Sequence, residues 1–212
     1  MSKKIGRIRQ INLEKIFAAA EEEFAKEGFK GASMQRIADR VALPRTNVHY
    51  YFNNKQTLYG SLLQRIVRIW NDAFDQIRAE DDPETALENY IRAKLRYSRD
   101  RPLASRIFAN EMIHGAPHIG DYLHQELREW LALKASVIQQ WIDQGRMDPI
   151  DPLQLIFMIW STTQHYADFA VQVCAVMGKQ ELSGDDYERI ADTVCHVILK
   201  GCGLRTRCAT SF

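Results

Sequence analysis

The 212-residue sequence predicts an all-α fold of about nine helices. Apolar residues recur at helical spacing in one segment after another, and no stretch alternates convincingly between apolar and polar residues as a strand would. Proline and glycine separate these segments. Charge also divides the chain: residues 1–60 hold eleven lysines and arginines against six carboxylates, whereas the remainder hold seventeen against twenty-one. We therefore expect a basic three-helix N-terminal domain followed by a six-helix body.

Two short helices are predicted between residues 33 and 52. The first begins at Met34, places its apolar residues on one face as far as Val41, and has Ser33 as its expected N-cap. Segment 42–44 breaks this helix, and its proline suits the first turn of a second helix, Arg45 to Phe52. Two short helices joined by so tight a turn are typical of a helix-turn-helix, whose second helix can enter the major groove of DNA.

The exposed face of the second helix carries side chains that can hydrogen-bond base edges or phosphates. These residues are Arg45, Thr46, Asn47, His49 and Tyr50. A basic arm is expected before the first helix, at Lys3, Lys4, Arg7 and Arg9. An ordinary helical hairpin and a solvated terminus are the alternatives to these two interpretations. The basic charge of this end favours a polyanionic partner, and we predict that it binds double-stranded DNA.

The same region resembles the DNA-binding domain of the TetR family of bacterial transcriptional regulators. The resemblance rests on Gly28-Phe29, Ser33-Met34, Ile37-Ala38 and, most specifically, the ending Tyr50-Tyr51-Phe52-x-x-Lys55-x-x-Leu58. It implies that Ser33, Thr46, Tyr51 and Lys55 contact phosphates while the middle of the recognition helix reads bases. The family usually has Gly, a small apolar residue and Ser at the turn, where this chain has Ala42-Leu43-Pro44. Because alanine is strained at positive φ, we expect a turn of slightly different shape.

The body is predicted as six further helices punctuated by proline and glycine. They cover residues 55–78, 84–101, 102–114, 119–144, 153–177 and 185–200. We place a DNA-binding domain at residues 1–54, a ligand-binding and dimerisation domain at 55–200, and a flexible tail at 201–212. The tail lacks periodicity.

The helix over 153–177 is the most informative part of the body, because polar residues interrupt a segment that begins apolar on every side. Trp160, Gln164 and Asp168 share one face, and with His165 or Tyr166 they could hold a small planar polar ligand. The alternative is a helix–helix interface in which Gln164 and His165 bond neighbouring backbone. We favour the interface for the Trp160 ring, and both interpretations stay open for Gln164.

The body also resembles that of the RutR-type pyrimidine-utilisation repressors. The similar segments are Arg96 to Asp100, Ala104 to Phe108 and, most strongly, Pro149 to Val173. This resemblance implies a homodimer formed by the last two long helices and an effector pocket within each body. It also implies uracil or thymine as the small-molecule effector, and hence a repressor released by its ligand.

Other classes of protein fit less well. No apolar run is long enough to cross a bilayer, and the N-terminus lacks the apolar segment of a secretory signal, so we expect a cytoplasmic protein with no membrane contact. Four cysteines lie at 174, 195, 202 and 208 without metal-ligand spacing, and we expect no metal and no cofactor. Two alternatives remain: a helical metal-dependent hydrolase that uses His165 with Asp168 or Glu111 with His114, and a nonspecific architectural DNA binder.

Overall fold

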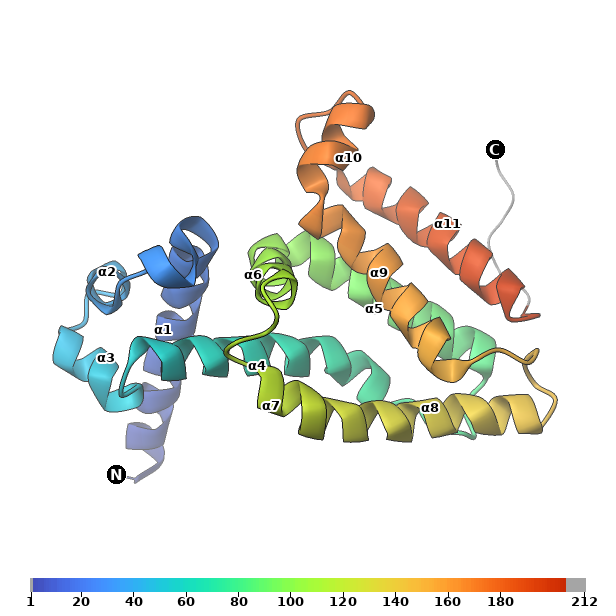
Figure 1. Cartoon of the computed structure of the whole chain (residues 1–212), viewed down its shortest axis with the longest axis horizontal. Helices are drawn as coiled ribbons and strands as arrows, with labels where there is room; N and C mark the ends of the chain where they lie inside the picture. The colour runs from blue at the N-terminus through green and yellow to red at the C-terminus, as the bar shows by residue number, and fades with distance from the viewer. Residues whose placement is uncertain (1, 205–212) are drawn as a thin grey trace. The chain divides into compact units, whose positions relative to one another are not determined.

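A computed structural model describes residues 2–204, and every regular element in this range is helical (Figure 1). The contacts divide these residues into two compact units: unit 1 holds residues 2–67 and 103–120, and unit 2 holds residues 68–102 and 121–204. Helix α4 begins in unit 1 and ends in unit 2, and α6 groups with unit 1 although it follows α5 in the chain.

Unit 1 contains the N-terminal helices and α6. Its elements are α1 (Ser2–Gly31), α2 (Met34–Arg40), α3 (Arg45–Tyr51), the start of α4 (Lys55–Asp75) and α6 (Pro102–Ile113). The basic arm expected before the first helix is wrong in one respect, because α1 begins at Ser2 and already contains Arg7 and Arg9. The buried core includes Ile16, Ile37 and Val48, one from each of the first three helices. Helix α2 packs against α1, and α3 packs against α2 (Figure 1).

Unit 2 contains the remaining helices. They are the end of α4, α5 (Pro83–Asp100), α7 (Gly120–Tyr122), the π-helix η1 (Leu123–Leu127), α8 (Arg128–Asp143), α9 (Pro152–Asp168), α10 (Ala170–Val176) and α11 (Gly184–Gly201). Helix α5 packs against both α9 and α11 (Figure 1). Since α7, η1 and α8 run on without a break and only Phe169 separates α9 from α10, residues 2–204 form nine helical segments, as the sequence predicts.

Side-chain caps explain where two helices of unit 2 begin. The Asp151 side chain accepts hydrogen bonds from the amides of Leu153 and Gln154 at 2.8 and 3.2 Å, and Pro152 occupies the first turn of α9. Ser183 and Asp186 form a reciprocal capping box at the start of α11. A side-chain acceptor therefore marks both helix starts, and in α9 a proline follows it.

The core of unit 2 is formed by large apolar side chains from α4, α5, α8, α9 and α11, including Phe74, Tyr90, Trp141, Ile156 and Ile198. The tail predicted at residues 201–212 starts where α11 ends. Its residue Cys202 is only 1% exposed and belongs to the core of unit 2. Residues 205–212 of the predicted tail lie outside the described residues. None of the described helices combines the length and apolar character needed to cross a membrane.

Candidate DNA-binding and effector sites

The start of α2 is anchored by two hydrogen-bonding side chains. The Ser33 hydroxyl accepts from the Gln35 amide at 3.2 Å, which confirms the predicted N-cap. The Glu23 carboxylate, buried in α1, accepts from the Ser33 amide at 3.1 Å and from Arg36 Nε at 2.6 Å. Arg40 pairs with Glu22 at 3.0 Å. The arginines of α2 are thus paired within unit 1, and Glu23 is an anchor that the sequence pattern did not reveal.

The turn between α2 and α3 keeps a left-handed residue. The Ala42 amide donates to the Asp39 carbonyl and the Leu43 amide to the Ala38 carbonyl, the two bonds of a Schellman motif. Ala42 occupies the position that glycine usually takes, at φ 52°. The helix-ending hydrogen bonds thus hold alanine in a left-handed conformation that glycine adopts without strain. The expected difference in shape from the family's turn stays a prediction. Pro44 is the N-cap of α3 and precedes its first turn.

Helix α3 presents a polar outer face and an apolar inner one. Val48 is fully buried and Phe52 is 6% exposed, whereas Tyr50 is 76% exposed and Thr46 and Asn47 are exposed. His49 is half-buried, and its Nδ1 lies 3.2 Å from the Asn53 carbonyl oxygen. The side chain of Arg45 lies outside the described residues. Three predicted contact residues therefore share the exposed face, and His49 is partly engaged with its own chain.

Two predicted phosphate ligands already have partners in unit 1. The Tyr51 hydroxyl oxygen accepts from Asn12 Nδ2 at 3.3 Å, so its own hydrogen remains available for donation. The Lys55 ammonium donates to the carbonyls of Lys30 and Ala32 at 3.2 and 2.9 Å and lies 4.8 Å from the Phe29 ring centroid. Lys55 therefore stabilises the end of α1, and only its third hydrogen is left for a phosphate.

In unit 2, the predicted effector residues divide by helical face. Trp160, Gln164 and Asp168 follow one stripe of α9, each about 40° from the last at 3.6 residues per turn, and all three are partly buried. Trp160 Nε1 donates to the Tyr90 hydroxyl oxygen at 2.7 Å. The Gln164 side chain forms no hydrogen bond with any part of the chain that the structure describes. The interface interpretation, which has Gln164 bonded to backbone, therefore loses its premise.

His165 and Tyr166 point elsewhere. His165 is exposed and its ring stacks on Phe169 at 5.1 Å, on the outer face of α9. Tyr166 is half-buried against the core, on the flank of the helix opposite Gln164. Their adjacency in sequence to Gln164 was misleading, because successive helix residues are about 100° apart. The candidate effector site therefore retains Trp160, Gln164 and Asp168 only.

A buried lysine lies against this stripe and was missed from the sequence. Lys94 of α5 is 2% exposed, and its ammonium lies 4.5 Å from the Trp70 ring centroid and 6.0 Å from that of Trp160. Burial lowers the pKa of Lys94 to about 7, and the charge of Asp168 opposes this shift. Within the described residues, the Lys94 ammonium has no hydrogen-bond partner. The signal that could have found it is a lysine on the apolar stripe of α5, seven residues after Leu87.

The hydroxyl groups of α9 donate to backbone carbonyls of the same helix. Thr162 and Thr163 donate to carbonyls one turn earlier, and Ser98 of α5 donates to the Thr163 carbonyl at 2.8 Å. These interruptions of the apolar run therefore cost little, and Ser98 ties α5 to α9 beside the candidate effector site.

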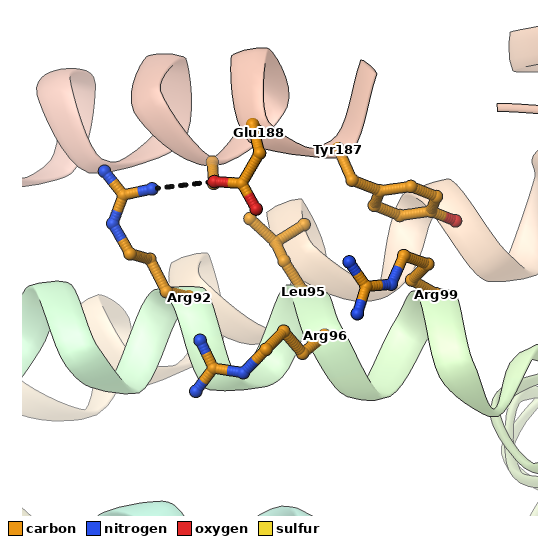
Figure 2. A pocket seen from close by; sticks show the side chains of 7 residues that line it. Arg92, Leu95, Arg96, Arg99, Tyr187 and Glu188 are labelled. Carbon is orange, nitrogen blue, oxygen red and sulfur yellow. Dashed lines mark ion pairs between the residues drawn. The ribbon is translucent and has the colours of Figure 1, made fainter. Parts of the chain in front are cut away.

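A groove in unit 2 lies between α5 and α11 and is shown in Figure 2. Arg92 spans it, pairing with Asp192 at 2.6 Å, with Glu88 at 2.9 Å and with Glu188 at 3.6 Å. The groove encloses only about 30 Å³, room for little more than a water molecule. We assign it to the ion pairs that join the two helices, and exclude it as an effector site.

The residues proposed for a hydrolase are not assembled. Glu111 bonds to His118, whereas the His114 ring lies 2.7 Å from the Asn110 carbonyl oxygen. In residues 2–204, no three His, Cys, Asp or Glu side chains are grouped so that they could hold a metal ion. Glu111 and His114 are therefore not brought together as this alternative requires.

Comparison with known proteins agrees with the two-part organisation. The family model of bacterial regulatory proteins of the tetR family matches residues 16–62, and that of the C-terminal region of YcdC-like proteins matches residues 63–205. The chain is 40% identical over 197 residues to the HTH-type transcriptional regulator RutR of Escherichia coli (strain K12), covering 92% of this chain and 93% of that protein. It is 29% identical over 134 residues to the HTH-type transcriptional repressor NicS of Pseudomonas putida, covering 63% of this chain and 62% of that protein.

Two solved structures show the same fold. The transcriptional regulator SCO4942 from Streptomyces coelicolor superposes with a TM-score of 0.68 at 24% identity, covering 87% of this chain and 96% of that one. AibR, in complex with isovaleryl coenzyme A and operator DNA, gives a TM-score of 0.65 at 16% identity over the same shares of the two chains. The two family matches and the extent of the RutR similarity place this chain in the TetR family of DNA-binding transcriptional regulators.

Proposed function

We propose that this protein is a homodimeric, cytoplasmic repressor of transcription that binds an operator through α3 and releases it when a pyrimidine such as uracil or thymine binds unit 2. The family membership supplies transcriptional regulation, and the dimer, the effector and the contact residues are our inference. We assign the chain a regulatory role and no catalytic one, as for its relatives.

Operator recognition is assigned to the exposed face of α3 and to hydroxyl donors around it. Asn47 and Thr46 are free to reach base edges and phosphates, and the Ser33 and Tyr51 hydroxyls can donate to phosphate oxygens. We keep Lys55 in this set through its third hydrogen only. A dimer would present two such helices to half-sites about 34 Å apart, one helical turn of DNA.

Dimerisation is assigned to the outer faces of α9, α10 and α11. These helices expose large apolar side chains: Phe157, Met158, Phe169, Val171, Val176 and Val197. Several are more than half exposed, including Val171 at 83% and Val197 at 60%. Exposed apolar residues concentrated on consecutive helices are typical of a protein–protein interface, and a two-fold axis would pair this surface with itself.

The observation that carries the effector proposal is the Lys94 ammonium, buried between two tryptophan rings without a hydrogen-bond partner in the described chain. A buried cation without an acceptor is costly, so a ligand that brings an acceptor gains affinity by supplying it. Gln164, unpaired on the adjoining stripe, offers one donor and one acceptor. Together they match a flat ring whose edge alternates carbonyl oxygens and N–H groups.

Uracil and thymine have that edge. A carbonyl oxygen would accept from Lys94, the neighbouring carbonyl and N–H would pair with Gln164, and the ring would lie along Trp70 and Trp160. Release of DNA then requires only that the ligand-bound dimer disfavour the operator-binding geometry. A coupling of about 1–3 kcal/mol would weaken operator binding by roughly 5–150-fold.

Calorimetric titration of the full-length protein with uracil, thymine and cytosine tests the proposal. Cytosine is the matched control because it carries an amino group in place of one carbonyl of uracil. That amino donor would face the Lys94 ammonium, which is also a donor. We expect binding of uracil and thymine and at least tenfold weaker binding of cytosine, since a mispaired buried donor costs more than one hydrogen bond contributes. No heat with any pyrimidine would remove the effector assignment and leave the family membership unaffected.

A further inference from the structure

Unit 1 contains a cavity of about 420 Å³ that the proposed function does not use. It lies among α1, the start of α4, α6 and the segment after α6, and we call it the α1–α6 cavity. Its inner wall includes Phe24, Phe29, Tyr59, Ile107 and His118. Its volume is within the range of small-molecule sites in proteins. Every residue that lines it belongs to the unit that carries the helix-turn-helix.

The aromatic side chains of the wall are packed against one another. Phe24 and Tyr59 have ring centroids 4.7 Å apart, and Phe29 and Tyr59 have centroids 5.1 Å apart. The His118 ring continues this wall at 3.9 Å from the Phe29 ring and 5.1 Å from the Tyr59 ring. Burial and the neighbouring Glu111 charge raise the pKa of Tyr59, so its phenol stays neutral. The cavity therefore offers flat apolar surfaces suited to an aromatic ring.

The orientation of His118 is fixed by a buried carboxylate. Glu111 is 4% exposed, accepts from the His118 amide at 2.6 Å and lies 3.2 Å from His118 Nδ1. A carboxylate favours the tautomer in which Nδ1 carries the hydrogen, and in that tautomer Nε2 is an acceptor. Nε2 has no hydrogen-bond partner in the part of the chain that the structure describes. A carboxylate that orients a histidine in this way makes its other nitrogen a stronger acceptor.

We propose that the α1–α6 cavity is a second ligand site, which binds a small aromatic molecule carrying one hydrogen-bond donor, such as a phenol. The ring lies along Phe29 and Tyr59, and the ligand's O–H or N–H donates to His118 Nε2. The site does not rest on the pyrimidine assignment, because it shares no residue with the stripe of α9. A ligand bound in the α1–α6 cavity would contact the same unit that carries the DNA-binding helices.

Fluorine NMR of the full-length protein with 4-fluorophenol and 4-fluoroanisole tests the site. The two probes share the aromatic ring, and only the phenol can donate. We expect the phenol to bind at least about fivefold more tightly, the factor that one net hydrogen bond supplies. Equal binding of the two probes, or no line broadening of either at the limit of solubility, would overturn the proposal.

Two variants show where the probe binds. Asn110→Trp places a large side chain at the exposed rim of the cavity and should weaken 4-fluorophenol binding at least tenfold. Gln139→Trp makes the same change at an exposed position of α8 and should leave binding unaltered. Circular dichroism confirms that both variants are folded. Unchanged binding of 4-fluorophenol to a folded Asn110→Trp protein would mean that the probe binds outside the α1–α6 cavity, and would refute the proposal.

Discussion

Lys55 Nζ lies 2.9 Å from the Ala32 carbonyl oxygen, so a cation of α4 closes the carboxyl end of α1. The same ammonium also bonds Lys30 and lies over the Phe29 ring. The family resemblance implies a phosphate contact for this lysine, and two of its three hydrogens already bond protein. A substitution at Lys55 therefore has two separable consequences, one for stability and one for DNA affinity.

We predict that Lys55→Met lowers the free energy of unfolding by about 1–2 kcal/mol, because two carbonyls lose a charged donor. If the third hydrogen also contacts a phosphate, the salt dependence of operator binding changes as well: the slope of log Kd against log salt falls by about 0.9 per protomer. Tyr51→Phe is the matched comparison. It should weaken binding to all sequences and leave the slope unaltered, since a phenol is neutral. Loss of the hydrogen bond from Asn12 should lower the free energy of unfolding by about 0.5–1.5 kcal/mol. Loss of base preference in either variant at constant affinity would contradict the phosphate assignment.

Ala42→Gly should stabilise the protein. Left-handed backbone costs an alanine roughly 1–2 kcal/mol, and glycine avoids this cost while losing some entropy on folding. We expect a net gain of about 1 kcal/mol in the free energy of unfolding by urea titration. Ala132→Gly, in exposed helical backbone of α8, should instead destabilise by about the same amount. A destabilised Ala42→Gly protein would mean that the turn does not hold a strained residue.

Gln164→Leu separates the two interpretations of this side chain. In the effector proposal it leaves the polar edge of a bound pyrimidine unpaired, at a cost on the order of 1–3 kcal/mol, roughly 5- to 150-fold in calorimetric affinity for uracil. Thermal stability should barely change, since the amide bonds no described residue. Gln154→Leu, at an exposed position of α9, is the control. A lower melting temperature with intact uracil affinity would return Gln164 to a structural role.

Lys94→Met should raise stability near neutral pH and abolish uracil binding. Burial places the folded-state pKa of Lys94 at about 7, below its ordinary value of 10.5. Between these two values the unfolded chain binds the extra proton, so the Lys94 contribution to stability increases as pH rises from about 7 to 10. Below pH 7 both states are charged and the burial penalty is present in full, on the order of a few kcal/mol. Urea unfolding between pH 7 and 10 should show that the free energy of unfolding of the wild type rises with pH, and that Lys94→Met reduces this rise. An identical dependence on pH in the two proteins would exclude a depressed pKa of Lys94.

The exposed apolar face of unit 2 predicts the oligomeric state. We expect Val197→Glu and Val171→Glu to convert a dimer into a monomer in sedimentation velocity, because each would bury a charge at the proposed interface. Leu133→Glu changes a comparably exposed apolar residue of α8, 67% exposed, and should leave the dimer intact. Operator affinity should fall when the dimer is lost, since one recognition helix contributes only half of the contacts. A wild-type monomer at micromolar concentration would refute this assignment.

Local chemistry explains what the sequence could predict. Asp151-Pro152 and Ser183 mark helix starts by bonds within three residues, and the inward positions of Val48 and Phe52 follow from helical periodicity alone. The positions that could not be foreseen depend on residues far apart in the chain. Lys94 meets Trp70 and Trp160 only after α4, α5 and α9 pack together, and the same packing decides which flank of α9 faces inward.

The hydrogen bond from Trp160 to buried Tyr90 has a further consequence for the evolution of ligand choice. It holds the indole plane in one orientation before any ligand arrives, so binding need not freeze that side chain. The Trp160 indole is thus held in place by a residue of the core. The Gln164 side chain, one turn later in α9, forms no hydrogen bond with the residues that the structure describes. A change at this single position can alter which ring edge is accepted while the indole stays in place. If the effector proposal holds, variants of this chain that differ at residue 164 should still bind flat molecules and should differ in the hydrogen-bond pattern that they select.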